Sequence, residues 1–266
     1  MPARIAIPMP HSGDREYAER AIPQYERAVT LAGGDPVRIA LDQTAAAVMK
    51  LIERCDAFLL PGSKADVDPA KFGSARSPHT AASDPGRDTV DELLLQDAYN
   101  MRKPVLGICY GLQSLNVYRT GSLVQHIRDF LPEETRTRVN HEAGRTVAVA
   151  HAAEIEGSSK LAEIVRGKKV AASGAQSDKI VVPVNSSHHQ SAGSIGDGLR
   201  VVARCPDDGI VEALEGTSPD HFVLAVQWHP ERSVEEDEPS RAIFRALVEA
   251  AGVRRRQLKG EFEGVK

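Results

Sequence analysis

The feature that most constrains the fold is an apolar strand that breaks at a Gly-x-Cys-x-Gly pentapeptide and continues as a helix, within residues 104–116. A side chain on a sharp strand-to-helix turn stands clear of the sheet, and Gly107 and Gly111 leave room that bulkier residues would block. A thiol at the N-terminus of the following helix also gains from the helix dipole, which favours the thiolate. The stretch predicts a nucleophile elbow carrying Cys109. A buried structural cysteine at an ordinary strand-to-helix junction is the alternative.

The segments before the elbow alternate between apolar strands and amphipathic helices. The pattern predicts a first strand at Ile5 and Ile7, with Asp14 as a cap for the helix that follows. Helices and strands are then expected over residues 15–31, 36–41, 44–54, 57–60 and 89–101. This β-α-β-α-β order argues for a parallel sheet. Residues 63–87 are rich in Pro, Gly, Ser and Asp without periodicity, which indicates a functional loop, with disorder as the alternative.

The pattern changes after the elbow helix, which is expected to end near Tyr118. Alternation predicts an antiparallel strand at residues 146–150, and further short strands and a closing helix follow at 181–184, 199–203, 211–214, 222–226 and 240–251. We therefore predict an α/β fold, with an open, mostly parallel, flavodoxin-like sheet, flanking helices and a short antiparallel strand region in the C-terminal half. Residues 1–252 are expected to form one domain, followed by a polar tail at 253–266.

Charge and cysteine content limit the classes of partner. A net charge of −4 gives no basic footprint for nucleic acid and favours a small-molecule partner. We find neither the apolar core of a signal peptide nor a run long enough to cross a bilayer, so we expect a cytoplasmic protein with no membrane partner. Cys55, Cys109 and Cys205 are widely separated and odd in number, which indicates neither a disulfide framework nor a zinc knuckle.

Two other strand ends meet the requirements of a cysteine nucleophile. In an extended segment, residues two apart point the same way, so His229 and Glu231 can lie on one side, with the carboxylate orienting the imidazole. An oriented imidazole is the base that activates a thiol. The backbone N–H groups near Gly62, with that of Tyr110, could bind the oxyanion of a tetrahedral intermediate. Without the other pieces, residues 229–231 would be interpreted as a surface His-Pro turn, and the segment at Gly62 as an ordinary turn.

These pieces each follow a strand, and in open α/β sheets such sites gather at the carboxyl ends of the strands. With them in place, the chain resembles the class I glutamine amidotransferase-like family, whose fold is an α/β sheet with a Cys-His-Glu triad. The resemblance implies Cys109 as nucleophile, His229 as base, Glu231 as its orienting acid, and oxyanion-hole amides at Gly62 and Tyr110. It implies no cofactor.

Within that family the chain looks most like the free-standing γ-glutamyl hydrolases of peptidase family C26. The stretches that carry this likeness are residues 60–62 with 66–69, residues 86–88, residues 185–190, and the spaced histidines His141 and His151. The chain departs from the family pattern at Tyr110, where an arginine is usual, at Ser63, where a second glycine is usual, and at residues 120–122, which replace a Gly-Gly pair. These departures bear on the substrate more than on catalysis, because any residue except proline supplies an amide N–H.

Polar side chains crowd after the strand at 181–184 and suit recognition of an amino acid's ammonium and carboxylate. The expected substrate-binding residues are Ser63, Gln113, Asn185, Ser186, Ser187, His188, His189 and Gln190. His188 and His189 could instead be metal ligands or a structural pair. We expect no metal, because no acidic or thiol partner sits at ligand spacing near them in the sequence.

The expected activity is hydrolysis of a γ-glutamyl amide, such as γ-glutamyl-γ-aminobutyrate, through a thioester on Cys109. One alternative is a glutaminase subunit that delivers ammonia to a separate synthase, since the same triad serves both uses. A second alternative is a non-catalytic binding protein on the same fold. The protein partners compatible with these interpretations are a second copy of the chain, as a homodimer, and a synthase if the glutaminase alternative holds, and the residues do not identify the released amine.

Overall fold

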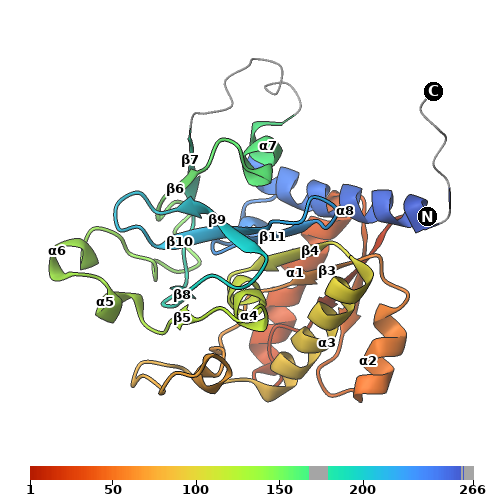
Figure 1. Cartoon of the computed structure of the whole chain (residues 1–266), viewed down its shortest axis with the longest axis horizontal. Helices are drawn as coiled ribbons and strands as arrows, with labels where there is room; N and C mark the ends of the chain where they lie inside the picture. The colour runs from red at the N-terminus through yellow and green to blue at the C-terminus, as the bar shows by residue number, and fades with distance from the viewer. Residues whose placement is uncertain (168–178, 259, 261–266) are drawn as a thin grey trace.

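A nine-stranded sheet forms the centre of the molecule in the computed structural model, which describes residues 1–167, 179–258 and 260 (Figure 1). Its strand order is β2-β1-β3-β4-β11-β10-β9-β6-β7. The first five strands run parallel: β2 (Asp35–Ile39), β1 (Arg4–Pro8), β3 (Ala57–Leu60), β4 (Val105–Ile108) and β11 (Val223–Val226). The other four pair antiparallel: β10 (Val211–Gly216), β9 (Leu199–Arg204), β6 (His151–Ile155) and β7 (Ile180–Val184). The predicted α/β fold with an antiparallel C-terminal region is confirmed.

Helices cover both faces of this sheet. One face packs against α1 (Arg15–Leu31), α7 (Lys160–Arg166) and α8 (Glu238–Leu258), and the other against α2 (Ala45–Ile52), α3 (Pro85–Met101) and α4 (Tyr110–Tyr118). The remaining elements are short: β5 (Leu123–Val124), which pairs with β8 (Ser191–Ala192), α5 (Ile127–Phe130), α6 (Glu133–Arg136), and the 3-10 turns η1 (Pro69–Phe72) and η2 (Pro230–Arg232). Among the described helices, none is both long and apolar enough to cross a membrane.

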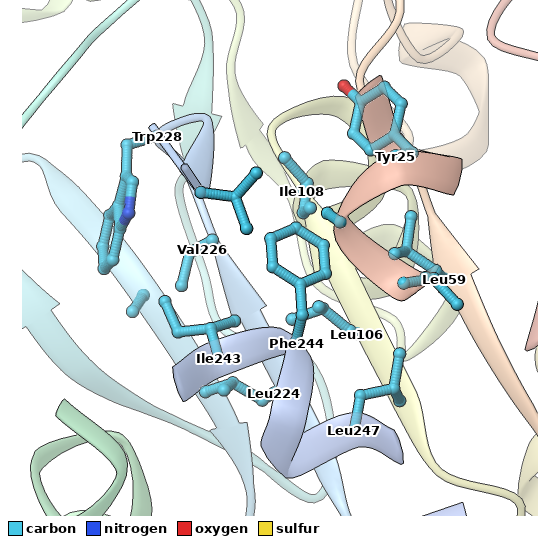
Figure 2. Packing of buried hydrophobic residues seen from close by; sticks show 14 of the residues in the cluster. Tyr25, Leu59, Leu106, Ile108, Leu224, Val226, Trp228, Ile243, Phe244 and Leu247 are labelled. Carbon is cyan, nitrogen blue, oxygen red and sulfur yellow. The ribbon is translucent and has the colours of Figure 1, made fainter. Parts of the chain in front are cut away.

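The core is divided by the sheet because successive strand residues point to opposite faces. Leu59, Leu106 and Leu224 lie on the face covered by α8, where Figure 2 shows them beside Phe244 and Leu247. Their chain neighbours Phe58, Val105 and Val223 belong to the core on the other face. Since both faces are covered, the central parallel strands are apolar throughout, which is why they read as continuous hydrophobic runs in the sequence.

Side-chain caps fix where the helices of the parallel half begin. The Asp14 carboxylate accepts a hydrogen bond from the Tyr17 N–H at 2.9 Å, as the sequence predicts, and the Asp84 carboxylate does the same for Arg87 at 3.1 Å. The second cap starts α3 at Pro85, four residues earlier than the apolar periodicity predicts. Proline is tolerated in the first turn of a helix because its missing N–H would have no intrahelical partner there.

The strand predicted at residues 146–150 is wrong. The segment is a loop, and the strand β6 begins only at His151. Val147 and Val149 are exposed, and the backbone bond from Ala150 N–H to the Val184 carbonyl at 2.8 Å merely extends the β6–β7 ladder by one residue. Alternation indicates a strand only where a neighbouring strand is present to pair with it, and sequence periodicity does not report that neighbour.

The C-terminal helix is longer than predicted, because α8 runs from Glu238 to Leu258 and so includes the first residues assigned to the polar tail. Two of its late arginines bind other parts of the chain. Arg254 donates to the Met101 carbonyl at 3.0 Å, and Arg255 donates to the Pro2 carbonyl at 2.8 Å. These bonds explain why the helix continues past Gly252. Residues 259 and 261–266 of the predicted tail lie outside the described residues.

Candidate active site

Cys109 occupies a strained turn between β4 and α4. Its φ of 52° and ψ of −105° lie in a region that side-chain-bearing residues rarely adopt. The flanking glycines are required by close approach. A Cβ at Gly107 would lie 2.8 Å from the Gly111 carbonyl carbon, and a Cβ at Gly111 would lie 2.1 Å from the Leu60 carbonyl oxygen. The predicted strand-turn-helix elbow is confirmed, and its backbone holds the cysteine side chain above the sheet.

His229 and Glu231 follow the end of β11 and are both buried. His229 Nδ1 lies 2.8 Å from Glu231 Oε1, a hydrogen bond in which the ring donates to the carboxylate. Residues 230–232 form the 3-10 turn η2, so the extended conformation predicted for this segment is wrong. His229 itself has φ −115° and ψ 81°, outside the helical region, as the proline after it predicts.

The protonation of His229 is set by its two neighbours. Burial lowers the pKa of the imidazole, but Glu231, Cys109 and hydrogen bonds to both raise that pKa to about 9. Burial raises the pKa of Glu231, and the pairing with His229 more than reverses this, so the carboxyl pKa is lowered overall. An imidazolium at His229 and an anionic Glu231 are therefore the stable states near neutral pH.

The ends of β3, β4 and β11 converge at this point. A Cβ built on Gly62 would lie 2.9 Å from His229 Cε1 and 3.6 Å from Cys109 Cβ, so the three strand ends are in direct contact. The Gly62 N–H donates to the Tyr25 hydroxyl at 3.1 Å. The Tyr110 N–H belongs to the first turn of α4, whose amides have no partner inside the helix.

The Tyr110 side chain points away from the thiol and packs into the protein. Its hydroxyl donates to Asp88 at 2.6 Å, and the Arg87 guanidinium lies 4.9 Å from its ring centroid. Arg87 is fully buried, pairs with Asp91 at 2.7 Å, and donates to the Pro61 carbonyl at 2.7 Å. Arg87 and Asp88 therefore hold the side chain of Tyr110, which follows Cys109, and the carbonyl of Pro61, which precedes Gly62.

A cavity of about 310 Å³ opens beside Cys109 and His229. Six of the predicted substrate-binding residues line it: Ser63, Gln113, Ser187, His188, His189 and Gln190. Five further polar side chains of the lining are not among the predicted site residues: Tyr17, Lys64, Asp66, Arg145 and Arg232. Two of these residues directly follow predicted site residues: Lys64 follows Ser63, and Arg232 follows Glu231. Arg145 lies at the start of the loop whose alternation predicts a strand.

Asn185 and Ser186 lie behind this lining and bond to backbone. The Asn185 amide donates to the His229 carbonyl and accepts from the His229 N–H, both at 2.9 Å. Ser186 donates to the His141 carbonyl at 2.8 Å. Asn185 thus clamps the backbone of the candidate base, and Ser186 fastens a neighbouring loop.

The cavity is rich in cationic side chains, and most of them have partners. Lys64 pairs with Asp14 at 2.9 Å, and Arg232 donates to the Ser187 hydroxyl at 2.8 Å. The one acidic lining residue, Asp66, contacts His189 Nε2 at 3.0 Å. Arg145 is exposed and forms no ion pair within residues 1–167 and 179–258. It is the cation best placed to meet an incoming anion.

The sequence spacing around His188 does not report which side chains surround it in the fold. The sequence shows no acidic side chain close to it, but the fold brings Glu212 of β10 to within 3.7 Å of His188 Nε2. His141 and His151 join the same buried group. The contact is invisible in the sequence because it joins a loop, two strands and the segment after β7.

The chain matches the family described as Peptidase C26 over residues 6–231. This protein belongs to that family. It is 36% identical to a protein of Mycobacterium tuberculosis that is provisionally named a glutamine amidotransferase, over 89% of this chain and 70% of that one. It is 31% identical to the gamma-glutamyl-gamma-aminobutyrate hydrolase PuuD of Escherichia coli, over 85% of this chain and 84% of that one.

Solved structures share the fold at low identity. The glutaminase domain of Trypanosoma brucei CTPS, solved with bound acivicin, has a TM-score of 0.56 and 18% identity, with 94% of each chain covered. A Thermoplasma acidophilum protein provisionally named as one subunit of GMP synthase has a TM-score of 0.63 and 16% identity, covering 97% of this chain and 98% of that one. The fold is that of class I glutamine amidotransferases, and the family is one of hydrolases.

Proposed function

We propose that this protein hydrolyses the γ-glutamyl amide bond of a small γ-glutamyl compound through a thioester on Cys109. The observation that carries the proposal is that Cys109 and His229 line one cavity of about 310 Å³ and that His229 is hydrogen-bonded to Glu231. The family assignment supports hydrolysis, and the named activity of the E. coli relative supports a γ-glutamyl amide as the substrate class.

The chemistry follows from the protonation of the pair. The raised pKa of His229, about 9, makes its imidazole a strong base for the thiol proton of Cys109, and transfer of that proton generates the attacking thiolate. The thiolate attacks the γ-carbonyl carbon, and the carbonyl oxygen becomes an oxyanion. The C–N bond then breaks while His229 gives its proton to the leaving amine. Water, deprotonated by His229, cleaves the thioester and regenerates the thiol.

The oxyanion is stabilised by backbone amides. Tyr110 directly follows Cys109 and is the first residue of α4. Its backbone N–H is therefore at a helix N-terminus, where the helix dipole also favours negative charge. The Gly62 N–H already has the Tyr25 hydroxyl as acceptor, so it contributes only when that bond is shared or released. We therefore assign the larger share of oxyanion binding to Tyr110.

The cationic lining favours substrates that carry carboxylates. Arg145, which is unpaired within the described residues, is the candidate partner for a carboxylate of the γ-glutamyl compound. Substitution by methionine keeps the apolar length and removes the charge. We expect Arg145→Met to raise KM about tenfold or more with little change in kcat, because the bond is made equally in the ground and transition states.

A panel of γ-glutamyl amides tests the proposal. Wild type should release amine from at least one member, such as γ-glutamyl-γ-aminobutyrate, and Cys109→Ala should lower that rate by about 10⁴-fold or more. A Cys109→Ala protein as active as wild type would overturn the assignment. Turnover of glutamine only when a synthase is present would favour the glutaminase alternative. Failure of Cys109 to react with a glutamine-like electrophile would favour a binding protein.

A further inference from the structure

A second group of buried histidines lies behind the cavity and takes no part in the proposed mechanism. His141, His151, His188 and Glu212 each turn one potential ligand atom to a common point, and these atoms all lie within 4.8 Å of one another. All four side chains are at most 3% exposed. They come from the loop before β6, the start of β6, the segment after β7, and β10.

The inward-facing atoms have no hydrogen-bond partner. His141 Nδ1, His151 Nε2, His188 Nε2 and both Glu212 oxygens are buried and unsatisfied. Glu212 Oε1 lies 3.4, 3.5 and 3.7 Å from the three nitrogens in that order, which is too long for good hydrogen bonds. Buried polar atoms without partners are costly, and four of these atoms, one from each residue, lie within 4.8 Å of one another.

The hydrogen bonds of the outward-facing ring nitrogens explain why the inward-facing nitrogens carry no hydrogen. His151 Nδ1 lies 3.0 Å from the Ala152 carbonyl oxygen, and His188 Nδ1 lies 2.8 Å from the Gln190 carbonyl oxygen. A carbonyl only accepts, so each of these nitrogens carries the hydrogen. His141 Nε2 likewise faces the Asp208 carboxylate at 2.9 Å. Each imidazole therefore presents a lone pair inward, which is the arrangement that second partners impose on metal-binding histidines.

We propose that His141, His151, His188 and Glu212 form a structural zinc site. Nitrogen and oxygen ligands at 2.0–2.2 Å around a tetrahedral ion are separated by about 3.3–3.5 Å, which matches the shorter of the observed separations from Glu212 Oε1. Three imidazoles and one carboxylate suit a borderline ion such as Zn²⁺. Four protein ligands complete its coordination, so the site has no open position for a substrate.

A proton is the competing occupant. A proton on Glu212 could donate to one imidazole nitrogen only, which leaves the other two nitrogens facing oxygen lone pairs. A divalent ion satisfies all four ligands at once and offsets the buried carboxylate charge. The bound ion would tie β10 and β6 to the segment of His188. The side chain of His188 also lines the cavity, so the ion would stabilise this part of the cavity wall. The inference does not depend on the proposed hydrolysis.

The test is the metal content of the untagged full-length protein. Wild type and Cys109→Ala should both bind close to one equivalent of Zn²⁺ per chain, and after chelation added Zn²⁺ should raise Tm by roughly 5–10 °C. Glu212→Gln, which keeps the shape, should lose the ion. His126→Ala alters a separate, more exposed histidine group and should retain it. Less than about a tenth of an equivalent, with no Tm response of chelated wild type to Zn²⁺, would overturn the proposal.

Spectroscopy distinguishes the proposed site from a neighbouring set of possible metal ligands. His141 also lies near Cys205 and Asp208, which together could hold an ion. The proposed site predicts that Co²⁺-substituted protein shows tetrahedral d–d bands without a thiolate charge-transfer band, and that Cys205→Ala still binds the ion. A charge-transfer band lost in Cys205→Ala would move the ion to the neighbouring set and overturn the proposed ligands. If Glu212→Gln fails to fold, the titration of chelated wild type still decides.

Discussion

Two buried histidine–carboxylate groups lie close together in this protein, and they differ in how the partners meet. In one, His229 donates a hydrogen bond of 2.8 Å to Glu231 beside a cavity. In the other, Glu212 stands 3.4–3.7 Å from three imidazoles and hydrogen-bonds to none of them. The same side chains are suited to proton transfer where one pair is bonded, and to holding a cation where several lone pairs converge.

The largest effect that tests this contrast is the replacement of each carboxylate by its amide. Glu231→Gln should lower kcat by about 10²–10⁴-fold, because the amide can neither fix the imidazole tautomer nor stabilise the imidazolium. Steady-state rates on the best γ-glutamyl amide measure this. Zinc content should be unchanged in Glu231→Gln and lost in Glu212→Gln. Loss of zinc from Glu231→Gln would show that the two groups are not separate.

The pH dependence gives a second signature of the catalytic pair. His229 is protonated below its pKa of about 9, so it can protonate the leaving amine there and loses that ability as the pH rises through about 9. We expect kcat/KM, which reports the ionisations of the free enzyme, to fall on the alkaline side near pH 9. In Glu231→Gln the residual activity should fall at lower pH, because the nearest group that raises the pKa has been neutralised. An alkaline limb that does not move would contradict this assignment.

The carboxylate behind His141 has a smaller expected effect. Asp208 accepts from the outward nitrogen of that ring at 2.9 Å and so fixes which nitrogen faces the ion. Asp208→Asn should weaken zinc binding by about 10–100-fold. Competition with a chromophoric chelator measures the affinity. An unchanged affinity would mean that Asp208 does not orient a ligand, and kcat in zinc-saturated protein serves as the control.

The sequence predicts the proposed catalytic group far better than the histidine cluster, for a physical reason. Cys109, His229 and Gly62 each closely follow a parallel strand, and the carboxyl ends of parallel strands meet at one edge, so strand prediction alone brings them together. The strands themselves are recognisable because both faces of the sheet are covered and the runs are wholly apolar.

The antiparallel half offers no such rule. Its strands meet in an order that local patterns do not encode, so Glu212 of β10 gives no sign of its contact with His188. The loop with Arg145 shows the same limit, since its alternation predicts a strand where the described part of the chain offers no partner strand. The sequence predicts substrate binding by Asn185, and only the fold shows its amide bonded to the backbone of His229.

Asn185 and its neighbour Ser186 allow a matched test of which group each residue supports. Asn185→Ala removes both bonds to the His229 backbone and leaves two buried groups unpaired, so we expect a loss of about 1–3 kcal/mol in unfolding free energy. We also expect kcat to fall by about tenfold, since small displacements of a base are costly. Ser186→Ala loses one bond to the His141 carbonyl and should leave kcat nearly unchanged. Denaturant unfolding and steady-state kinetics measure both, and equal kcat losses would contradict the assignment.

The smallest effect concerns backbone strain that serves neither group. Thr120 has a φ of 71°, in the left-handed region where a β-branched residue is strained, and its side chain is exposed. Removing the Cβ relieves about 1–2 kcal/mol of strain, while the added freedom of glycine in the unfolded chain takes back about 0.5–1 kcal/mol. Thr120→Gly should therefore stabilise the protein by up to about 1.5 kcal/mol, raising Tm by up to roughly 5 °C, with kcat and zinc content unchanged. Cys109 is the matched comparison, because its φ of 52° belongs to the turn that carries the proposed nucleophile. A lower Tm for Thr120→Gly would show that the threonine side chain contributes more than its strain costs.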